Sequence, residues 1–413
     1  MHRRSVLLFF LGVLSLACRG ERAAGPLRQE AYVWQRSWTP AVQESARQAR
    51  DFTGLVVLAA EVNFEGLAPR VVRIPLDSES LKGKPIGAAL RVNAFPSRFA
   101  ARPDLVRLLQ GLIGDLKREA RAKGIRLSEI QLDYDCPESK LEDYRHLLPS
   151  LRKAASPLPL TITALPSWMR HRRAFRKLIE QADGYVLQLH SLAPLDKREQ
   201  KIVLLDGVAA RAWVEDAARF GRPFRAALPT YGYIAAFDAK DRLIGLLAEG
   251  PLLSWSKGVT VRTASSDPVA MAEVIRGWTR DRPAELAGVL WYRLPVAGDR
   301  LNWSWSTLRA VTAGRAPQGA IRATLREPEP GLVEIDLLNA GEAEAPWPSP
   351  VRIHWQGKSP IAADGLAVYR IVPARPGEIR LEGSTIGLLR PGERRTIAWL
   401  RFAARTEVEV ELP

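Results

Sequence analysis

Apolar and polar positions alternate along the first three quarters of the chain in a way that predicts strands and helices in turn. Short apolar runs bounded by turn residues are typical of buried strands, and longer runs with a period near 3.6 are typical of helices. Strands are predicted at residues 31–35, 55–60, 87–92, 129–137, 158–164, 184–189, 224–228 and 286–292, with a short extra one at 71–74. Helices are predicted at residues 40–50, 103–123, 141–154, 171–181, 213–220, 268–280 and 304–311.

This series favours an α/β fold of the (β/α)8 TIM-barrel type over residues 30–312. About 280 residues suit eight such units. A doubly wound open sheet is the competing topology, and it is disfavoured because no glycine-rich phosphate loop follows the first strand. One connection, residues 231–266, is longer than the others and contains a predicted hairpin of residues 233–237 and 243–247. Long ordered excursions at barrel mouths are usually functional.

The pattern changes near residue 313. A linker at 312–319 precedes short strands only, separated by turn signals such as Arg-Pro-Gly-Glu at 390–393. This is typical of a β-sandwich, and we expect residues 317–413 to form an immunoglobulin-like accessory domain. It either packs on the barrel and contacts substrate or is a structural appendage. The strands are predicted at residues 321–325, 333–339, 351–355, 368–372, 379–381, 395–403 and 408–412.

The first residues have the features of an export signal. Arg3 and Arg4 precede an apolar run at 6–17 that is too short for a membrane span. The run ends in Leu-Ser-Leu-Ala before Cys18, which resembles a bacterial lipid-attachment site. We therefore expect a signal peptide at 1–17, a tether at 18–29 and a lipid anchor on Cys18 that holds the protein at the cell envelope, facing the periplasm or the exterior. Cleavage nearby, giving a soluble exported protein, is the alternative.

Candidate chemistry centres on the predicted strand at 129–137. Side chains on a strand alternate between faces, so Gln131, Asp133 and Asp135 share one face. They lie towards the carboxyl end of the strand, where α/β barrels place their active sites. Asp133 and Asp135 are therefore the candidate catalytic residues. The alternative is a structural pair neutralised by the many arginines.

Other polar and aromatic residues near strand ends would converge on the same mouth. Aromatic rings pack on sugar rings, amides and acids bond hydroxyl groups, and paired acids hydrolyse acetals. The pattern thus predicts a carbohydrate site, with a polysaccharide or oligosaccharide as partner. The candidate substrate-binding residues are Trp34, Glu61, Asn93, Gln131, Trp168, Gln188, His190, Tyr231, Trp255 and Trp291.

In this hypothesis Asp135, nearer the mouth, is the general acid/base, and Asp133 is the stabiliser or nucleophile. Glu61 and Glu249 are alternates for the second role. A metal held by His190 and the two aspartates is a weaker alternative, and neither a metal nor a cofactor is expected. Cys136 is expected to be a buried inert thiol.

Composition narrows the function further. The chain has 413 residues, 2 cysteines and a net charge of +15. Two cysteines, one of them Cys18, exclude a disulfide framework. The excess positive charge, with a local cluster at 170–177, is interpreted as solvated helix faces, because no nucleic-acid-binding motif accompanies it. Affinity for an anionic partner, as in an envelope assembly factor, stays open.

Residues 32–36 (Tyr-Val-Trp-Gln-Arg), residues 130–135 (Ile-Gln-Leu-Asp-Tyr-Asp) and the lipid-attachment motif resemble a bacterial family, domain of unknown function 3142. The resemblance implies a (β/α)8 barrel distantly similar to glycoside hydrolases, with no established substrate. Asp133 and Asp135 also resemble part of the Asp-x-Asp-x-Glu motif of chitinase-like hydrolases. Pro137 stands where that motif has its catalytic glutamate, and Glu138 is one position late.

Two functions are therefore expected from the sequence. The first is an exported glycoside-hydrolase-like enzyme acting on a cell-envelope or extracellular polysaccharide. The second is a noncatalytic glycan-binding envelope lipoprotein, which the proline at 137 favours.

Overall fold

A computed structural model describes residues 21–93, 98–190, 203–248, 255, 258–383 and 387–413. The predicted signal peptide at 1–17 and Cys18 lie outside the described residues. Within the described ranges, none of the helices combines the length and the apolar character that a membrane span requires.

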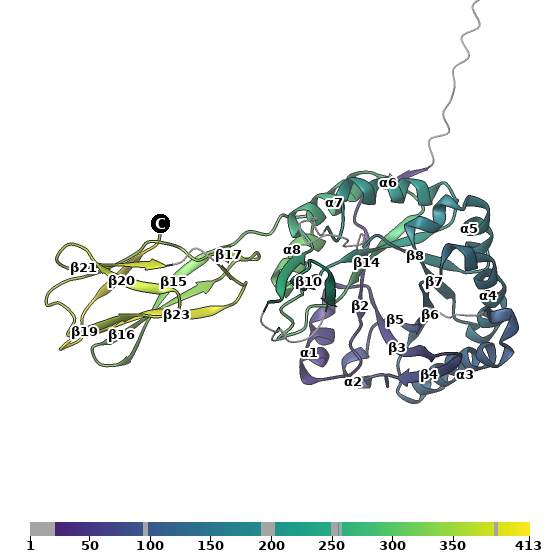
Figure 1. Cartoon of the computed structure of the whole chain (residues 1–413), viewed down its shortest axis with the longest axis horizontal. Helices are drawn as coiled ribbons and strands as arrows, with labels where there is room; N and C mark the ends of the chain where they lie inside the picture. The colour runs from purple at the N-terminus through teal and green to yellow at the C-terminus, as the bar shows by residue number, and fades with distance from the viewer. Residues whose placement is uncertain (1–20, 94–97, 191–202, 249–254, 256–257, 384–386) are drawn as a thin grey trace, which may run out of the picture.

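Eight parallel strands form a closed barrel (Figure 1). The ring closes because the first strand pairs in parallel with both the second and the last. In order around the ring, the strands are β2 (Arg28–Val33), β3 (Gly54–Glu65), β5 (Ile86–Val92), β6 (Leu127–Tyr134), β7 (Leu160–Ala164), β8 (Gly184–Gln188), β9 (Phe224–Pro229) and β14 (Leu286–Tyr292). This confirms the predicted barrel and excludes the doubly wound sheet. The short extra strand is β4 (Ala68–Arg73), antiparallel to the end of β3.

Helices surround the barrel (Figure 1), and several of them begin at a side chain that caps their free backbone N–H groups. Thr39, Asp206 and Asp267 each accept such a hydrogen bond. The second helix is a single turn that the sequence pattern did not predict. The helices are α1 (Pro40–Gln48), α2 (Ser78–Leu81), α3 (Pro103–Ala122), α4 (Leu141–Ala155), α5 (Arg172–Ile179), α6 (Gly207–Ala218), α7 (Pro268–Arg280) and α8 (Trp305–Thr312).

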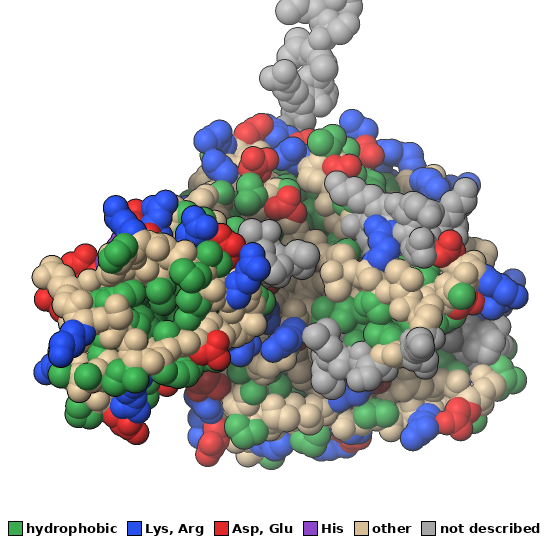
Figure 2. Space-filling view, turned by 60° about the vertical axis from the view of Figure 1, so that its left-hand side comes forward, with side chains coloured by type: hydrophobic (Ala, Val, Ile, Leu, Met, Phe, Trp, Pro, Cys, Tyr) green, Lys and Arg blue, Asp and Glu red, His purple; other side chains and the backbone are tan. Residues whose placement is uncertain are grey.

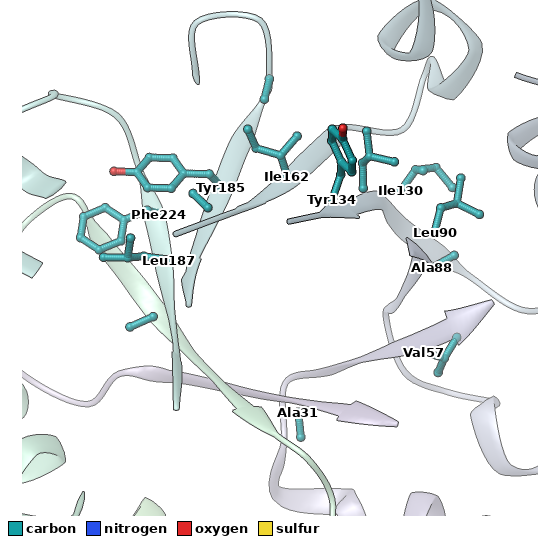
Figure 3. Packing of buried hydrophobic residues seen from close by; sticks show 14 of the residues in the cluster. Ala31, Val57, Ala88, Leu90, Ile130, Tyr134, Ile162, Tyr185, Leu187 and Phe224 are labelled. Carbon is teal, nitrogen blue, oxygen red and sulfur yellow. The ribbon is translucent and has the colours of Figure 1, made fainter. Parts of the chain in front are cut away.

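The main hydrophobic core lies between the barrel and its helices. Side chains on the outer faces of the strands, among them Val57, Leu90 and Ile162, point away from the barrel axis (Figure 3). A smaller cluster fills the barrel itself with side chains of opposite parity, such as Val56, Ala89 and Val186. Strand alternation thus separates one core outside the barrel from another inside it.

The amino-terminal end of the barrel interior contains charges. Arg225 of β9 bonds Glu30 of β2 at 2.6 Å and Glu129 of β6 at 2.7 Å. All three side chains are largely buried, and Thr161 donates a further hydrogen bond to Glu129. Small residues make room for them: a Cβ atom on Gly87 would lie 2.9 Å from a Glu129 oxygen. When the barrel closes, Arg225 therefore neutralises the two carboxylates that β2 and β6 bring into its interior.

The long excursion after β9 forms a three-stranded antiparallel sheet. Strands β10 (Gly232–Phe237) and β11 (Leu243–Leu247) confirm the predicted hairpin. A third strand, β12 (Thr260–Ser265), pairs with the other side of β10 and was not predicted. This sheet follows directly on Tyr231, so it fixes that residue at the carboxyl end of the barrel.

The C-terminal part consists of two four-stranded antiparallel sheets that share a hydrophobic core. Their strand orders are β15-β16-β23-β19 and β20-β21-β18-β24. Arg390 ties this part to the barrel by donating to the backbone oxygen of Asn302 at 2.7 Å. The two sheets form a sandwich, and its immunoglobulin-like character stays a prediction. The strands are β15 (Ile321–Glu329), β16 (Leu332–Asn339), β17 (Ala345–Pro346), β18 (Val351–Trp355), β19 (Ala362–Gly365), β20 (Tyr369–Pro373), β21 (Glu378–Gly383), β22 (Leu388–Leu389), β23 (Arg394–Arg401) and β24 (Val408–Glu411).

Replacing Arg225 by leucine should destabilise the barrel by about 3–5 kcal/mol, because it removes the cation between two buried carboxylates. Thermal melting followed by circular dichroism measures the effect. Arg219→Leu is the matched control, since Arg219 is exposed and pairs with the exposed Asp216. Equal melting temperatures for the two variants would contradict the role of Arg225.

Candidate active site

A cavity of about 430 Å³ lies at the carboxyl end of the barrel strands. Its walls combine two carboxylates, two arginines, four tyrosines, one tryptophan and one histidine. This is the end at which parallel barrels carry their active sites. The lining residues are Tyr32, Trp34, Arg91, Asp133, Asp135, Leu165, Gln188, His190, Ala227, Tyr231, Tyr233, Ala248, Tyr292 and Arg293.

Asp133 is fixed at the bottom of this cavity. It is 4% exposed, and its Oδ1 atom accepts hydrogen bonds from Thr163 at 2.8 Å and from Gln188 at 3.1 Å. Burial raises the pKa of Asp133, while the charge of Arg91 and these two hydrogen bonds counteract the rise. The donors come from β7 and β8, so the barrel holds this carboxylate from two neighbouring strands.

Asp135 differs from Asp133 in that its carboxyl group is held less firmly. It directly follows β6 and is exposed to solvent within the concave wall, where it forms no ion pair with the described residues and Gln188 is close enough to donate a hydrogen bond to it. The surrounding protein and the nearby charge of Asp133 raise the pKa of Asp135 to about 7. A carboxyl group with this pKa can both give and take a proton near neutral pH.

Rings from three elements form one wall of the cavity. His190 stacks on Tyr292 with ring centroids 5.1 Å apart, and its Nδ1 atom lies 3.2 Å from the Tyr231 hydroxyl. Burial lowers the pKa of His190 to about 4, so its imidazole is neutral at pH 7. The Tyr231 hydroxyl in turn lies 2.9 Å from that of Tyr233. The wall therefore offers ring faces and hydroxyl groups but no charge.

Gln131 lies beneath the cavity with one polar group unused. It is fully buried, and its Oε1 atom accepts a hydrogen bond of 2.6 Å from the Tyr32 hydroxyl. Its amide nitrogen has no partner among the described residues. Buried amide donors are normally satisfied, so this group has spare capacity for a water molecule or a ligand.

Several predicted site residues are brought together as expected. Trp34, Gln188, His190 and Tyr231 line the cavity beside the two aspartates. Two others lie at strand ends but not on its wall. Glu61 is engaged by Arg36 through contacts of 2.5 and 3.1 Å, and Asn93 bonds Asn63 and Arg91.

The three other predicted tryptophans do not reach the cavity. Trp168 is fully buried behind the barrel, where its ring nitrogen donates to the Cys136 carbonyl at 3.2 Å. Trp291 points away from the barrel interior and bonds Gln29 at 2.6 Å, because inward-facing positions on β14 have the parity of Tyr292. Trp255 packs over Gly245 of β11. Glu249 lies outside the described residues.

Five cavity residues escaped the sequence interpretation: Tyr32, Arg91, Tyr233, Tyr292 and Arg293. Strand alternation could have indicated three of them. Tyr32 is two positions before Trp34, Arg91 two before Asn93, and Tyr292 has the opposite parity to Trp291. Arg293 lies over Tyr231 and binds Asp299 at 2.5 Å, a contact that no sequence pattern predicts.

The residues after Asp135 leave the cavity. Pro137 is exposed, and Glu138 begins a 3-10 turn in which it pairs with Arg170 at 2.7 Å and His171 at 2.5 Å. The hydrogen bond from Arg170, and to a smaller extent the one from His171, lowers the pKa of Glu138 to about 2. Glu138 therefore cannot act as an acid in place of the motif glutamate.

Cys136 and metal chemistry find no support in this region. Cys136 is 2% exposed, and burial raises the pKa of its thiol to about 12, so it stays protonated. Within the described ranges, no three His, Cys, Asp or Glu side chains gather closely enough to hold a metal ion.

Two family models match the chain. One, described as "Domain of unknown function (DUF3142)", matches residues 82–297, which include the acidic strand but not residues 32–36. The other, described as "Domain of unknown function (DUF8456)", matches residues 322–403 in the C-terminal sandwich. No curated protein matches the chain.

Solved structures give distant likenesses. The spore cortex-lytic enzyme SleL of Bacillus megaterium QM B1551 has a TM-score of 0.47 at 13% identity, over 66% of this chain and 72% of that one. A chitinase of Chromobacterium violaceum ATCC 12472 has a TM-score of 0.46 at 15% identity, over 70% and 98%. The GH18 chitinase ChiB of Flavobacterium johnsoniae has a TM-score of 0.44 at 12% identity, over 70% and 94%.

The two aspartates should titrate as a coupled pair. Asp133→Asn should lower the pKa of Asp135 from about 7, because one of the charges that raises it is removed, while burial keeps it above its usual range. Arg91→Gln should instead raise the pKa of Asp135 above about 7, because the positive charge of Arg91 lowers it. Carbon-13 NMR of labelled aspartate measures both shifts, with Asp135→Asn assigning the signal and the exposed Asp216→Asn as control. An unchanged pKa in Asp133→Asn would contradict the coupling.

Proposed function

Since the chain belongs to the DUF3142 family, whose function is not known, we propose from its cavity that it is a glycoside-hydrolase-like enzyme. It is exported and acts on a cell-envelope or extracellular polysaccharide. The observation that carries this proposal is Asp135, a carboxyl group without an ion-pair partner among the described residues and with a pKa of about 7, next to the fixed carboxylate of Asp133. Two carboxyl groups in different environments are what acetal hydrolysis requires.

The roles follow from these environments. Asp135 holds the proton and donates it to the departing glycosidic oxygen, then accepts one from water. Asp133 is the stabiliser or nucleophile, since Thr163 and Gln188 hold it in place and favour its charged form. Glu61 is a poorer partner for Asp135, because Arg36 already engages both of its oxygens.

The remaining lining suits a sugar ring. Trp34, Tyr231 and Tyr292 offer ring surface on one side of the cavity. Gln188 and the hydroxyl of Tyr233 offer hydrogen bonds to sugar hydroxyl groups. Aromatic faces combined with a few directed polar groups are characteristic of carbohydrate sites.

A second candidate function is a noncatalytic glycan-binding envelope lipoprotein. The specific observation in its favour is the position after the acid pair, where Pro137 replaces a carboxylate and Glu138 is committed to Arg170 and His171. Such a protein would keep the cavity and its aromatic wall but release no product.

In a screen of polysaccharides for released reducing ends, Asp135→Asn should lower kcat by about 10²- to 10⁴-fold, the usual contribution of a general acid. For the wild type, kcat/KM should fall as the pH rises through about 7, because Asp135 then loses its proton. Asp133→Asn should also be inactive while remaining folded. The exposed Asp216→Asn serves as the matched control.

Full activity of Asp135→Asn would refute the assignment of the acid. If the wild type binds one of the polysaccharides but releases reducing ends from none of them, the second candidate function is established instead.

Anchoring is tested separately. Cys18→Ser should move the protein from the membrane fraction to the soluble fraction, because the only proposed lipid acceptor is lost. Cys136→Ser is the control, since that thiol is buried in the barrel and should not affect fractionation. Retention of Cys18→Ser in the membrane fraction would refute the anchor.

A further inference from the structure

Arg91 is a cation on the cavity wall that the proposed hydrolysis does not use. It lies on β5 and is only partly exposed, and its side chain lines the same cavity as Asp133 and Asp135. Its Nε atom donates to the Asn93 oxygen at 3.1 Å, and Asn93 is held in turn by Asn63. Asn93 and Asn63, which do not line the cavity, thus orient the guanidinium of Arg91.

The outer end of this guanidinium has no protein partner. Among the described residues, the Asn93 oxygen is the only hydrogen-bond acceptor of Arg91, and no carboxylate lies within ion-pair distance of it. The N–H groups of its two terminal nitrogens therefore donate to none of the described residues. Arg293, the other arginine of the cavity, differs in this respect, because it binds Asp299 at 2.5 Å.

A purely internal role as counter-ion explains Arg91 less well. The charges of Asp133 and Asp135 act on it, but their carboxylates stay beyond contact distance, and Asp133 takes its hydrogen bonds from Thr163 and Gln188. Counter-ions elsewhere in this barrel are in direct contact, as Arg225 is with Glu30 and Glu129. A buried cation is normally paired, so the free end of Arg91 indicates an anion supplied from outside.

We propose that the cavity binds an anionic sugar residue, with the terminal nitrogens of Arg91 holding its carboxylate. The proposal rests on the proposed function, since it names the substrate class of that site: a polysaccharide that contains uronic acid. The end of a guanidinium presents two parallel N–H donors, which match the two oxygens of a carboxylate. Tyr233 lines the same cavity close enough for the charge of Arg91 to act on its hydroxyl, which offers a further donor.

The charge of the whole chain suits such a polymer. The net charge is +15, and Lys and Arg side chains are spread over the visible face, some beside the hollow between the barrel and the C-terminal sandwich (Figure 2). A positive protein attracts a polyanion over a distance set by the ionic strength. Arg91 would convert that general attraction into recognition at one sugar.

The test measures binding and hydrolysis separately on matched pairs of oligosaccharides. Oligomers of galacturonate, glucuronate and mannuronate are compared with their methyl esters, which keep the sugar and remove the charge. At least one uronate should bind about 10- to 100-fold more tightly than its ester, the range expected for charge-assisted hydrogen bonds. Arg91→Gln should abolish this preference and Arg91→Lys restore it in part. Arg173→Gln, which removes an equal charge from the exposed face of α5, should leave it unchanged.

The outcomes separate this inference from the proposed function. Equal affinity for every acid and its ester, or a preference that survives Arg91→Gln, overturns the inference even if neutral polymers are hydrolysed. An Arg91-dependent preference without any released reducing ends supports the inference and refutes the hydrolase. Sulfated galactan is included as a third ligand, because it carries sulfate groups and no carboxylates. If it binds in an Arg91-dependent way and no uronate does, the carboxylate assignment is overturned.

Discussion

Closure of the eight-stranded barrel is the constraint on which the rest of the structure depends. Once β2 pairs with both β3 and β14, every second side chain of each strand must enter one narrow interior. Polar groups there need partners, because water cannot reach the lower part. Arg225, Glu30 and Glu129 meet this need at the amino-terminal end, and the glycines of neighbouring strands leave room for them.

Strand β6 shows how depth in the barrel sets the chemistry of a side chain. Glu129, Gln131, Asp133 and Asp135 follow one another at every second position on the same face. Glu129, the deepest, is neutralised by Arg225, whereas Asp133 is held by two neutral donors. Asp135, at the mouth, forms no ion pair with the described residues. Carboxylates on one strand are thus neutralised by an arginine at one end and lack an ion-pair partner among the described residues at the other.

The mouth of the barrel brings together side chains that lie far apart in the sequence. The ring of Tyr292 from the last strand packs on His190, which follows the sixth strand, and the hydroxyl of Tyr231 bonds the same histidine. Arg91 reaches this space from the third strand. Each ring of this wall contacts another, so the surface is already formed by the protein's own packing.

Pattern arguments predicted the barrel, its succession of strands and helices, and the common face of Asp133 and Asp135, because strand and helix periods and the parity of β6 are local properties. Parity also explains the errors. Trp291 was predicted to line the cavity, but its neighbour Tyr292 has the inward parity. Trp168 lies after β7 in a 3-10 helix that turns it behind the barrel, a direction that no local period encodes.

The amino-acid sequence by itself determined the succession of strands and helices, the change to an all-β segment after residue 312, and the common face of Asp133 and Asp135. Only the tertiary structure decided which charges remain free. Glu61 and Glu138 form ion pairs with arginines. Asp135 and the terminal nitrogens of Arg91 form no ion pair with the described residues. The reason is that pairing depends on distances between segments remote in sequence, and those distances exist only after the ring has closed.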